Sequence, residues 1–187
     1  MPQAALILVC KVMRLPVAKT MNVLEVVSVV IITAIALLFQ YAYHDLPCPL
    51  CLLQRIGIIC IGIGFILNLR FGPRPSHYAL SIFAALFTGA VALRQTLLHI
   101  VPGSGSYGPL LLGLHMYTWV FILAVLFIVW IAFVLLFDAK PIEANSLNNR
   151  LYVIVRNILL LVLTALIAIN LITTLMECGL TQCPVNP

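Results

Sequence analysis

The stretch HDLPCPLCLLQR, residues 44–55, holds the side chains best suited to chemistry: two cysteines spaced as Cys-x-x-Cys and, one helical turn later, an arginine. Thiolates are the nucleophiles of disulfide exchange. Pro47 and Pro49 favour a helix that begins at this pair, because proline is tolerated in a first helical turn. The unpaired N–H groups and the dipole at such a helix end stabilise a thiolate. The motif therefore predicts that Cys48 and Cys51 are redox-active.

Arg55 follows Cys51 by four residues, so a helix places both side chains on one face. Fifteen residues separate Arg55 from Arg70, or about 22 Å of helix. In a hydrocarbon core about 30 Å thick, Arg55 then lies below the surface. An arginine there is costly unless it snorkels or finds a partner. Two roles stay open: the guanidinium stabilises the thiolate and binds a lipid-dissolved electron acceptor, or the side chain snorkels to the interface.

Two other uses of the cysteine pair stay open. One is a structural disulfide, although a loop of seven or eight residues hardly needs a staple when two packed helices already tether its ends. The other is a zinc site built from four cysteines, which thiol oxidation outside the cytoplasm disfavours. We predict no resident metal.

The composition indicates where these side chains lie. Of the 187 residues, 64% are hydrophobic and only 8% are charged, and the mean hydropathy is +1.19. A soluble domain of this size exposes far more charge, so we predict an all-α integral membrane protein. The formal charge of +5 does not indicate a nucleic-acid partner, because the ten basic residues are scattered between apolar runs.

Five segments reach the length of about 20 apolar residues that a transmembrane helix needs. They are residues 23–43, 47–69, 77–98, 116–137 and 154–176. The connections between them are short. Residues 1–187 are therefore predicted to form a single membrane domain surrounded by the lipid bilayer.

Basic residues predict the orientation, since cytoplasmic loops collect lysine and arginine. With the N-terminus inside and the C-terminus outside, eight of the ten basic residues lie inside: Lys11, Arg14, Lys19, Arg70, Arg74, Lys140, Arg150 and Arg156. Cys48 and Cys51 then lie on the outer side, where disulfides persist. Cys178 and Cys183 lie there too, in an outer tail of residues 177–187.

Residues 1–22 are predicted to form a cytoplasmic segment before the first membrane helix. A surface-lying amphipathic helix and an over-extended start, with Met13 or Met21 as the initiator, both stay open. A signal-peptide core is disfavoured, because no basic residues precede the apolar run and no small-residue cleavage site follows it. Glu25 is expected near an inner helix end, where interfacial charge is ordinary.

The stretch CPLCLLQR resembles the active-site motif of the disulfide bond formation protein B (DsbB) family. ALRQTLLHIVP, residues 92–102, is similar to the end of that family's third helix, and GLHMYTW, residues 113–119, resembles the start of its fourth. The resemblance covers roughly residues 23–137. It implies a four-helix bundle in a bacterial inner membrane, with one thiol pair that exchanges disulfides with a periplasmic DsbA-like partner. It also implies ubiquinone or menaquinone, which meets the inner cysteine beside Arg55.

The chain departs from this family in three respects. The loop between the third and fourth helices lacks the cysteine pair that the family usually carries there. A fifth helix follows, and the chain ends in ECGLTQCPVNP. In RQTLLH, Gln95 and His99 look exchanged relative to the family, and both are predicted to contact the quinone.

Cys178 and Cys183 provide a replacement for the missing loop pair. Gly179 permits a turn between them, and seven extended residues span at most about 23 Å, which reaches Cys48 from the top of the fifth helix. We predict that this pair shuttles disulfides to the soluble partner. A permanent disulfide that rigidifies the terminus stays open as the alternative.

The predicted function is a membrane thiol–disulfide oxidase. Electrons from the reduced partner pass through Cys178 and Cys183 to Cys48 and Cys51, and then to the quinone. One alternative is an oxidase that uses only the first pair and has a structural tail. Another is a non-catalytic membrane protein, such as a small transporter or an assembly subunit, whose outer loops are stapled by disulfides.

Overall fold

The computed structural model describes residues 2–43, 48–100, 110–137 and 150–179. Five helices account for most of these residues: α1 (Pro2–Tyr43), α2 (Pro49–Phe71), α3 (Pro75–Leu98), α4 (Met116–Phe137) and α5 (Arg150–Cys178). The short strands β1 (Leu110–Leu111) and β2 (Leu114–His115) form an antiparallel hairpin before α4. All five helices are long and apolar enough to cross a membrane. The prediction of an all-α integral membrane protein is confirmed.

Most helix boundaries lie within a few residues of those predicted, but α1 does not. It starts at Pro2 rather than near residue 23, although its apolar span covers only Lys19–Ala42. The first residues are rich in alanine, leucine, valine and lysine and contain no glycine, and Pro16 does not interrupt the helix. Residues 2–22 are thus the beginning of α1 rather than a separate segment.

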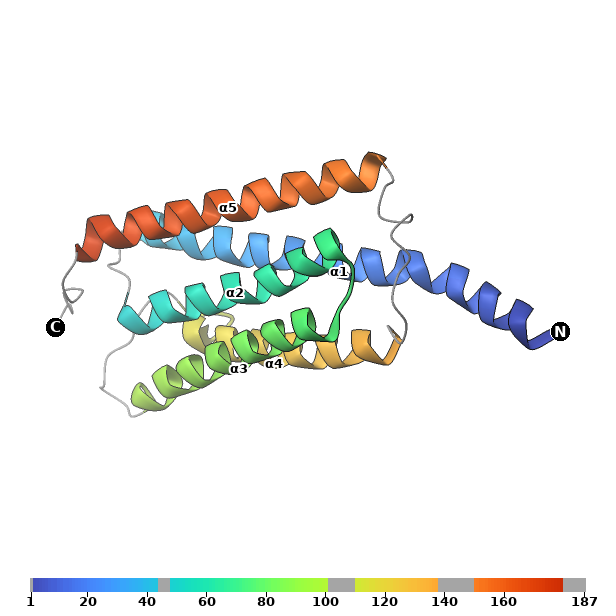
Figure 1. Ribbon diagram of the computed structural model, residues 1–187. Coiled ribbons are helices and arrows are strands. Elements are labelled where there is room, and N and C mark those ends of the chain that lie inside the picture. Colours follow the sequence, from blue (N-terminus) through green and yellow to red (C-terminus); the bar gives the residue numbers. More distant parts are fainter. Residues whose placement is uncertain (1, 44–47, 101–109, 138–149, 180–187) are drawn as a thin grey trace.

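Helix α2 lies at the centre of the bundle. It packs against α3 on one side and against α1 and α5 on the other, while α4 packs mainly on α3 (Figure 1). The apolar core that these helices share includes four side chains that are 0% exposed: Val29, Ile61, Phe65 and Ile131. The buried side chains of α2 are therefore within reach of several helices.

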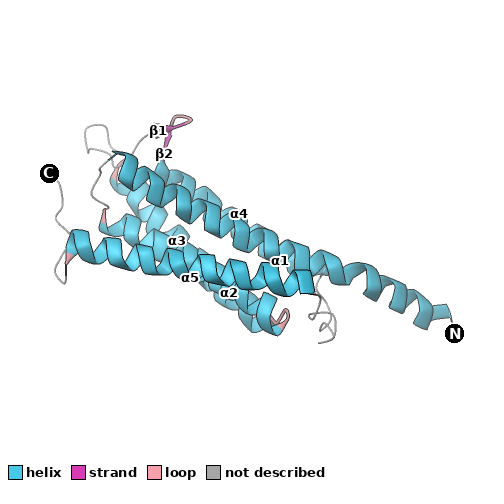
Figure 2. Cartoon of the chain, turned by 90° about the horizontal axis from the view of Figure 1, so that it is seen from above, coloured by secondary structure: helices cyan, strands magenta, loops and turns pink. Residues whose placement is uncertain are grey.

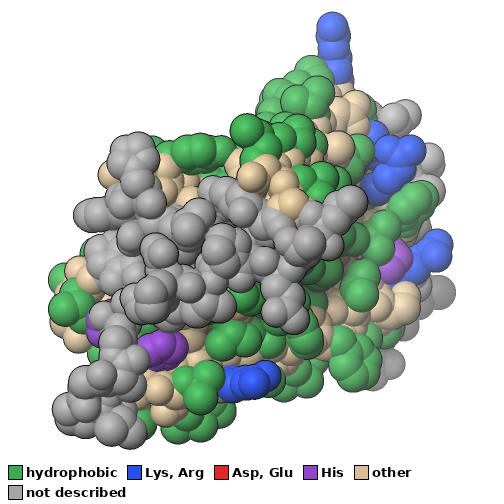
Figure 3. Space-filling model, turned by 90° about the vertical axis from the view of Figure 1, so that its left-hand side faces the viewer, with side chains coloured by type: hydrophobic (Ala, Val, Ile, Leu, Met, Phe, Trp, Pro, Cys, Tyr) green, Lys and Arg blue, Asp and Glu red, His purple; other side chains and the backbone are tan. Residues whose placement is uncertain are grey.

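The bundle has two chemically different ends. The thiol end is the one where α2 begins, α3 and α5 end, and the β1–β2 hairpin precedes α4 (Figure 2). The opposite, basic end carries Lys19, Arg70, Arg74 and Arg150 near helix termini. Seen from the thiol end, the described surface is mostly hydrophobic and shows no acidic side chain (Figure 3).

A polar network at the basic end ties three helices together. Asn22 of α1 donates a hydrogen bond to the Tyr78 hydroxyl of α3, at 3.0 Å. Asn68 of α2 donates to the Asn22 side-chain oxygen, at 3.1 Å. Buried amides are stable in an apolar interior only when they are bonded in this way. The network therefore fixes the register of α1, α2 and α3.

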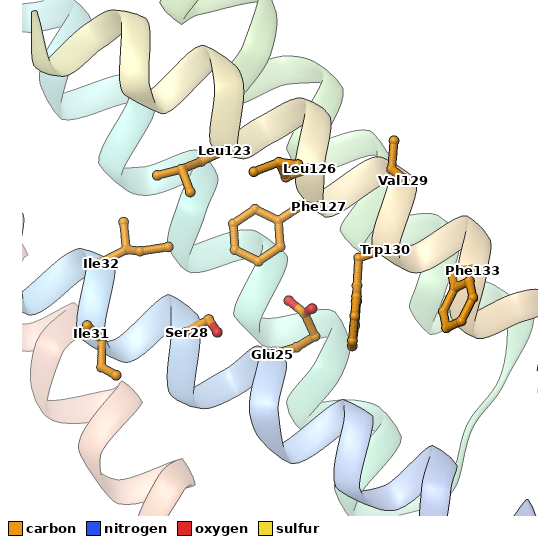
Figure 4. A pocket seen from close by; sticks show the side chains of 10 residues that line it. All are labelled: Glu25, Ser28, Ile31, Ile32, Leu123, Leu126, Phe127, Val129, Trp130 and Phe133. Carbon is orange, nitrogen blue, oxygen red and sulfur yellow. The ribbon is translucent and has the colours of Figure 1, made fainter. Parts of the chain in front are cut away.

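Glu25 does not lie at an interfacial helix end as predicted. It is 7% exposed and lines a groove of about 670 Å³ between α1 and α4, beside Trp130 (Figure 4). Its Oε2 atom is buried without a hydrogen-bond partner among the described residues. Six residues, or about 9 Å of helix, separate Glu25 from Lys19 at the start of the apolar span.

Small residues allow α2 and α3 to approach closely. The Ser81 hydroxyl donates to the Ile61 carbonyl across the interface, at 2.9 Å. A Cβ atom at Gly64 would meet the Ser81 hydroxyl and lie 2.6 Å from the His77 carbonyl oxygen. Small residues at such contacts are typical of membrane helix pairs, which gain stability from close packing.

We predict that Gly64→Ala destabilises the bundle by about 1–3 kcal/mol, because the methyl group forces α2 away from the α3 backbone. Gly89→Ala is the matched control, since its Cβ would lie 3.4 Å from the nearest atom, the Ala124 Cβ. Thermal unfolding of the two purified variants in detergent measures the difference. Equal unfolding temperatures would show that the α2–α3 contact is not tight.

Candidate active site

Cys48 and Cys51 begin α2, as the proline pattern predicted. Cys48 is the N-cap residue, Pro49 occupies the first turn, and the Leu52 N–H donates to the Cys48 carbonyl at 3.1 Å. Both cysteines are half-buried and free. The helix start thus directs the backbone N–H groups of Leu50 and Cys51 toward the Cys48 sulfur.

The surroundings of Cys48 favour its thiolate. The pKa of Cys48 is lowered from 9.0 to about 6, chiefly by a hydrogen bond from the Cys51 side chain. The backbone N–H groups of Cys51 and Leu50 and the charge of His99 act in the same direction, while burial opposes them. At neutral pH, Cys48 is therefore mainly a thiolate and so a nucleophile.

Gln95 of α3 is the side chain that contacts both sulfur atoms. Its Nε2 atom lies 3.4 Å from the Cys51 sulfur and 3.8 Å from the Cys48 sulfur and donates to both. The Cys51 thiol lies 3.7 Å from the Gln95 Oε1 atom. Gln95 is 0% exposed, so its amide is a fixed donor beside the thiol pair.

Gln54 orients the Gln95 amide. Its Nε2 atom donates to the Gln95 Oε1 atom at 2.7 Å, and it is 3% exposed. With that oxygen occupied, the Gln95 NH₂ group points at the sulfurs. Sequence reasoning did not single out Gln54, although its position three residues after Cys51 places it on the same helix face.

Arg55 is buried rather than snorkelling, at 6% exposed. Its Nη1 atom donates to the Gln40 Oε1 atom of α1 at 2.7 Å and to the Asn170 Oδ1 atom of α5 at 3.1 Å. Its Nη2 atom donates to the Ala36 carbonyl at 3.4 Å. The guanidinium is thus held by two other helices, one turn below the thiols.

Gln40 and Asn170 were also missed from sequence. Each is a buried amide within an apolar helix, 8% and 6% exposed. Sequence reasoning considered ionisable residues inside the membrane and passed over amides. Uncharged polar side chains in membrane helices hydrogen-bond across helix interfaces, which is the signal that would have found them.

His99 caps α3 beside the same site. Its Nδ1 atom lies 2.8 Å from the Gln95 carbonyl oxygen, and its ring centroid lies 5.5 Å from that of Tyr117. The ring of His115 stacks on Tyr117, and the two ring centroids lie 5.2 Å apart. Two histidines and a tyrosine therefore border the site at the thiol end.

Of the two tail cysteines, Cys178 lies within the described residues and Cys183 does not. Cys178 is the last residue of α5. Cys178 follows Asn170 by about 12 Å of helix, and Cys48 precedes Arg55 by about 10 Å, toward the same end of the bundle. Because Asn170 bonds Arg55, the end of α5 is level with Cys48.

The zinc alternative needs all four outer cysteines, and Cys183 lies outside the described residues. Among the described side chains, no three of the His, Cys, Asp and Glu type lie together as metal ligands do. The described thiols instead contact amide and backbone donors.

The sequence around this site is similar to known proteins. The family model "Disulfide bond formation protein DsbB" matches residues 18–106. A relative named Disulfide bond formation protein B, from Stutzerimonas stutzeri (strain A1501), is 33% identical over 94 residues, 48% of this chain and 58% of the relative. A relative of the same name from Chromobacterium violaceum is 38% identical over 71 residues, 36% of this chain and 43% of the relative.

These matches cover part of each protein. The chain spans about half the length of the curated relatives it matches. No solved structure matches it. The matched region contains the Cys-x-x-Cys motif, Arg55 and Gln95, which the fold brings together at one end of the bundle. Through residues 18–106, the chain is similar to the disulfide bond formation protein B family.

Proposed function

We propose that this protein is a membrane thiol–disulfide oxidase that re-oxidises a soluble DsbA-like protein and passes the electrons to a membrane quinone. The observation that carries the proposal is the contact of one buried amide, Gln95, with both sulfurs of the Cys-x-x-Cys motif. A structural disulfide needs no such donor. A thiol pair that cycles does, because the donor stabilises sulfur when it is charged.

The two cysteines suit different roles. Cys48, at the helix start and with a lowered pKa, is the sulfur that forms the mixed disulfide with a partner. Cys51 lies deeper, beside Gln95 and one turn above Arg55. A thiolate of the reduced tail pair, Cys178 and Cys183, attacks Cys48 of the oxidised pair, and Cys51 leaves as a thiolate. The second tail thiolate then releases Cys48, so the tail pair is oxidised by two electrons and the Cys48–Cys51 pair is reduced.

The residues around Cys51 fit a quinone. The groups that converge there, the Arg55 guanidinium and the Gln95 amide, are hydrogen-bond donors, and the carbonyl oxygens of a quinone accept hydrogen bonds. Arg55 and Gln95 would hold it, with His99 at the thiol end. A bound quinone supplies an acceptor for the two electrons and two protons that leave when the disulfide re-forms.

The orientation follows from charge. Five basic residues of the described chain lie toward the end opposite the thiols: Lys19, Arg70, Arg74, Arg150 and Arg156. Since cytoplasmic ends collect such residues, we place the basic end inside and the thiol end on the periplasmic side of a bacterial inner membrane. Disulfides form and persist on that side.

The tail pair is the proposed shuttle. Cys178 ends a helix that is level with Cys48 at the thiol end, as the Asn170 contact with Arg55 requires. Gly179 has a φ of +61°, so the chain turns directly after Cys178. This geometry supports a path in which the partner exchanges disulfides with Cys178 and Cys183, and these exchange with Cys48.

The proposed function predicts quinone reduction by the purified full-length chain. With a reduced DsbA-like protein as donor, absorbance should show stoichiometric loss of the quinone as the donor is oxidised. Cys51→Ser should abolish the reaction, because Cys48 then has no neighbouring thiol with which to re-form the disulfide, the step that donates electrons to the quinone. Cys60→Ser, on the same helix and half-buried, should retain the wild-type rate. Oxidation of the donor without loss of quinone would refute the proposed acceptor.

The lowered pKa of Cys48 predicts a pH profile. Alkylation of the reduced protein by iodoacetamide, followed at the Cys48 peptide by mass spectrometry, should be half-maximal near pH 6. The rate rises above this pH, where the thiolate dominates, and falls below it. Cys51→Ala removes the main stabilising hydrogen bond and should move the midpoint upward, toward 9.0. A wild-type midpoint already near 9 would contradict the conclusion that the site stabilises the Cys48 thiolate.

If the tail pair is the shuttle, its removal should slow the reaction with the soluble partner but not the reaction with a small thiol. Replacing Cys178 and Cys183 together with serine should slow oxidation of the soluble partner by at least about tenfold, which is about 1.4 kcal/mol of barrier. Reaction of dithiothreitol with Cys48 should keep its rate, since a small thiol needs no shuttle. Unchanged oxidation of the partner would identify the tail as structural.

A further inference from the structure

We infer that Asn170 of the fifth helix is a positioning residue for Arg55, so that α5 completes the electron-acceptor site. The inference rests on the proposed function for its meaning, since it assigns a part of that same site. The matched family region, residues 18–106, ends well before α5. Nothing in that resemblance therefore assigns a role to the fifth helix.

The contact itself is direct. The Asn170 Oδ1 atom accepts a hydrogen bond of 3.1 Å from the Arg55 Nη1 atom, and the same nitrogen donates to the Gln40 Oε1 atom at 2.7 Å. Arg55 and Asn170 are each 6% exposed. The pair is thus enclosed between α1, α2 and α5, where water does not compete for the hydrogen bonds.

Two acceptors on one nitrogen fix the guanidinium. An Nη nitrogen carries two hydrogens, and here one goes to α1 and the other to α5. Because the guanidinium is planar and rigid, fixing one nitrogen also fixes the directions of its remaining N–H groups. Without the α5 acceptor, the hydrogen bonds of the guanidinium that the structure describes go to α1 alone, to Gln40 and Ala36, so it is no longer held from two sides. The N–H groups of Arg55 would then no longer point in one fixed direction toward the electron acceptor.

The last turns of α5 around Asn170 are packed and hydrogen-bonded. The hydroxyl groups of Thr173 and Thr174 donate to the backbone carbonyl of Asn170, at 3.0 and 2.7 Å. Helix α5 also contacts both α1 and α2. The amide is therefore presented by a packed segment rather than by a mobile end.

The choice of an amide is chemically specific. An aspartate at this position would neutralise the guanidinium, and a hydrophobic residue would leave a buried cation with one acceptor fewer. An asparagine oxygen accepts the hydrogen bond and leaves the positive charge of Arg55 available. A charged donor is what stabilises oxygen atoms that gain electrons.

The test is a double-mutant cycle in the full-length protein, with Asn170→Leu, Arg55→Gln and the double variant. The expected result for Asn170→Leu is a KM for the quinone raised about tenfold, the effect of one lost hydrogen bond to a charged group. Disulfide exchange between Cys48 and the reduced partner, followed in a single turnover, should keep its rate. In the Arg55→Gln background, Asn170→Leu should have no further effect on KM, because Asn170 acts through Arg55.

Asn157→Leu is the matched control, an exposed asparagine on the same helix, and it should leave KM unchanged. Additive effects of the Arg55 and Asn170 variants, or an unchanged KM in Asn170→Leu, would overturn the inference. If the wild type itself reduces no quinone, the proposed function fails instead. The same cycle is then scored by thermal unfolding, where additive effects overturn the Arg55–Asn170 pairing and coupling supports it.

Discussion

A buried positive charge organises this protein. The Arg55 guanidinium lies within the apolar span of α2, where an unpaired cation costs several kcal/mol. Its hydrogen bonds go to an amide on α1, an amide on α5 and a backbone carbonyl of α1. These contacts tie the first and last helices to the helix that carries the thiols. The need to supply hydrogen-bond acceptors for one buried cation thus explains why α1 and α5 both contact α2 at this depth.

A second chain of polar groups runs from the same helix to the sulfurs. Gln54 occupies the oxygen of Gln95, and Gln95 in turn directs its NH₂ group to Cys51 and Cys48. Neither glutamine is more than 3% exposed. In such a setting each hydrogen bond is stronger than in water, and each missing one is costly. The site is therefore built to remain intact when the sulfur pair changes its charge.

The sequence predicted the elements better than the contacts. Five apolar runs predicted five helices, and the prolines around Cys48 predicted where α2 starts, because both signals are local. The partners of Arg55 were not predictable in the same way, since Gln40 and Asn170 lie fifteen and 115 residues from it. The described hydrogen bonds of the Arg55 guanidinium go to α1 and α5, while Gln95 of α3 donates to the Cys51 sulfur. Amides in apolar helices are weak signals alone and become informative only when a buried charge needs acceptors.

The length of α1 has a structural consequence. Its 42 residues extend about 63 Å, twice the thickness of a hydrocarbon core, and Figure 1 shows the N-terminal part projecting beyond the other helices. The apolar span of α1 begins only at Lys19, so the residues before it extend the helix beyond that span. Ala36 and Gln40, which accept hydrogen bonds from the guanidinium, lie on this same helix. One helix therefore reaches from the neighbourhood of Arg55 to well beyond the basic end of the bundle.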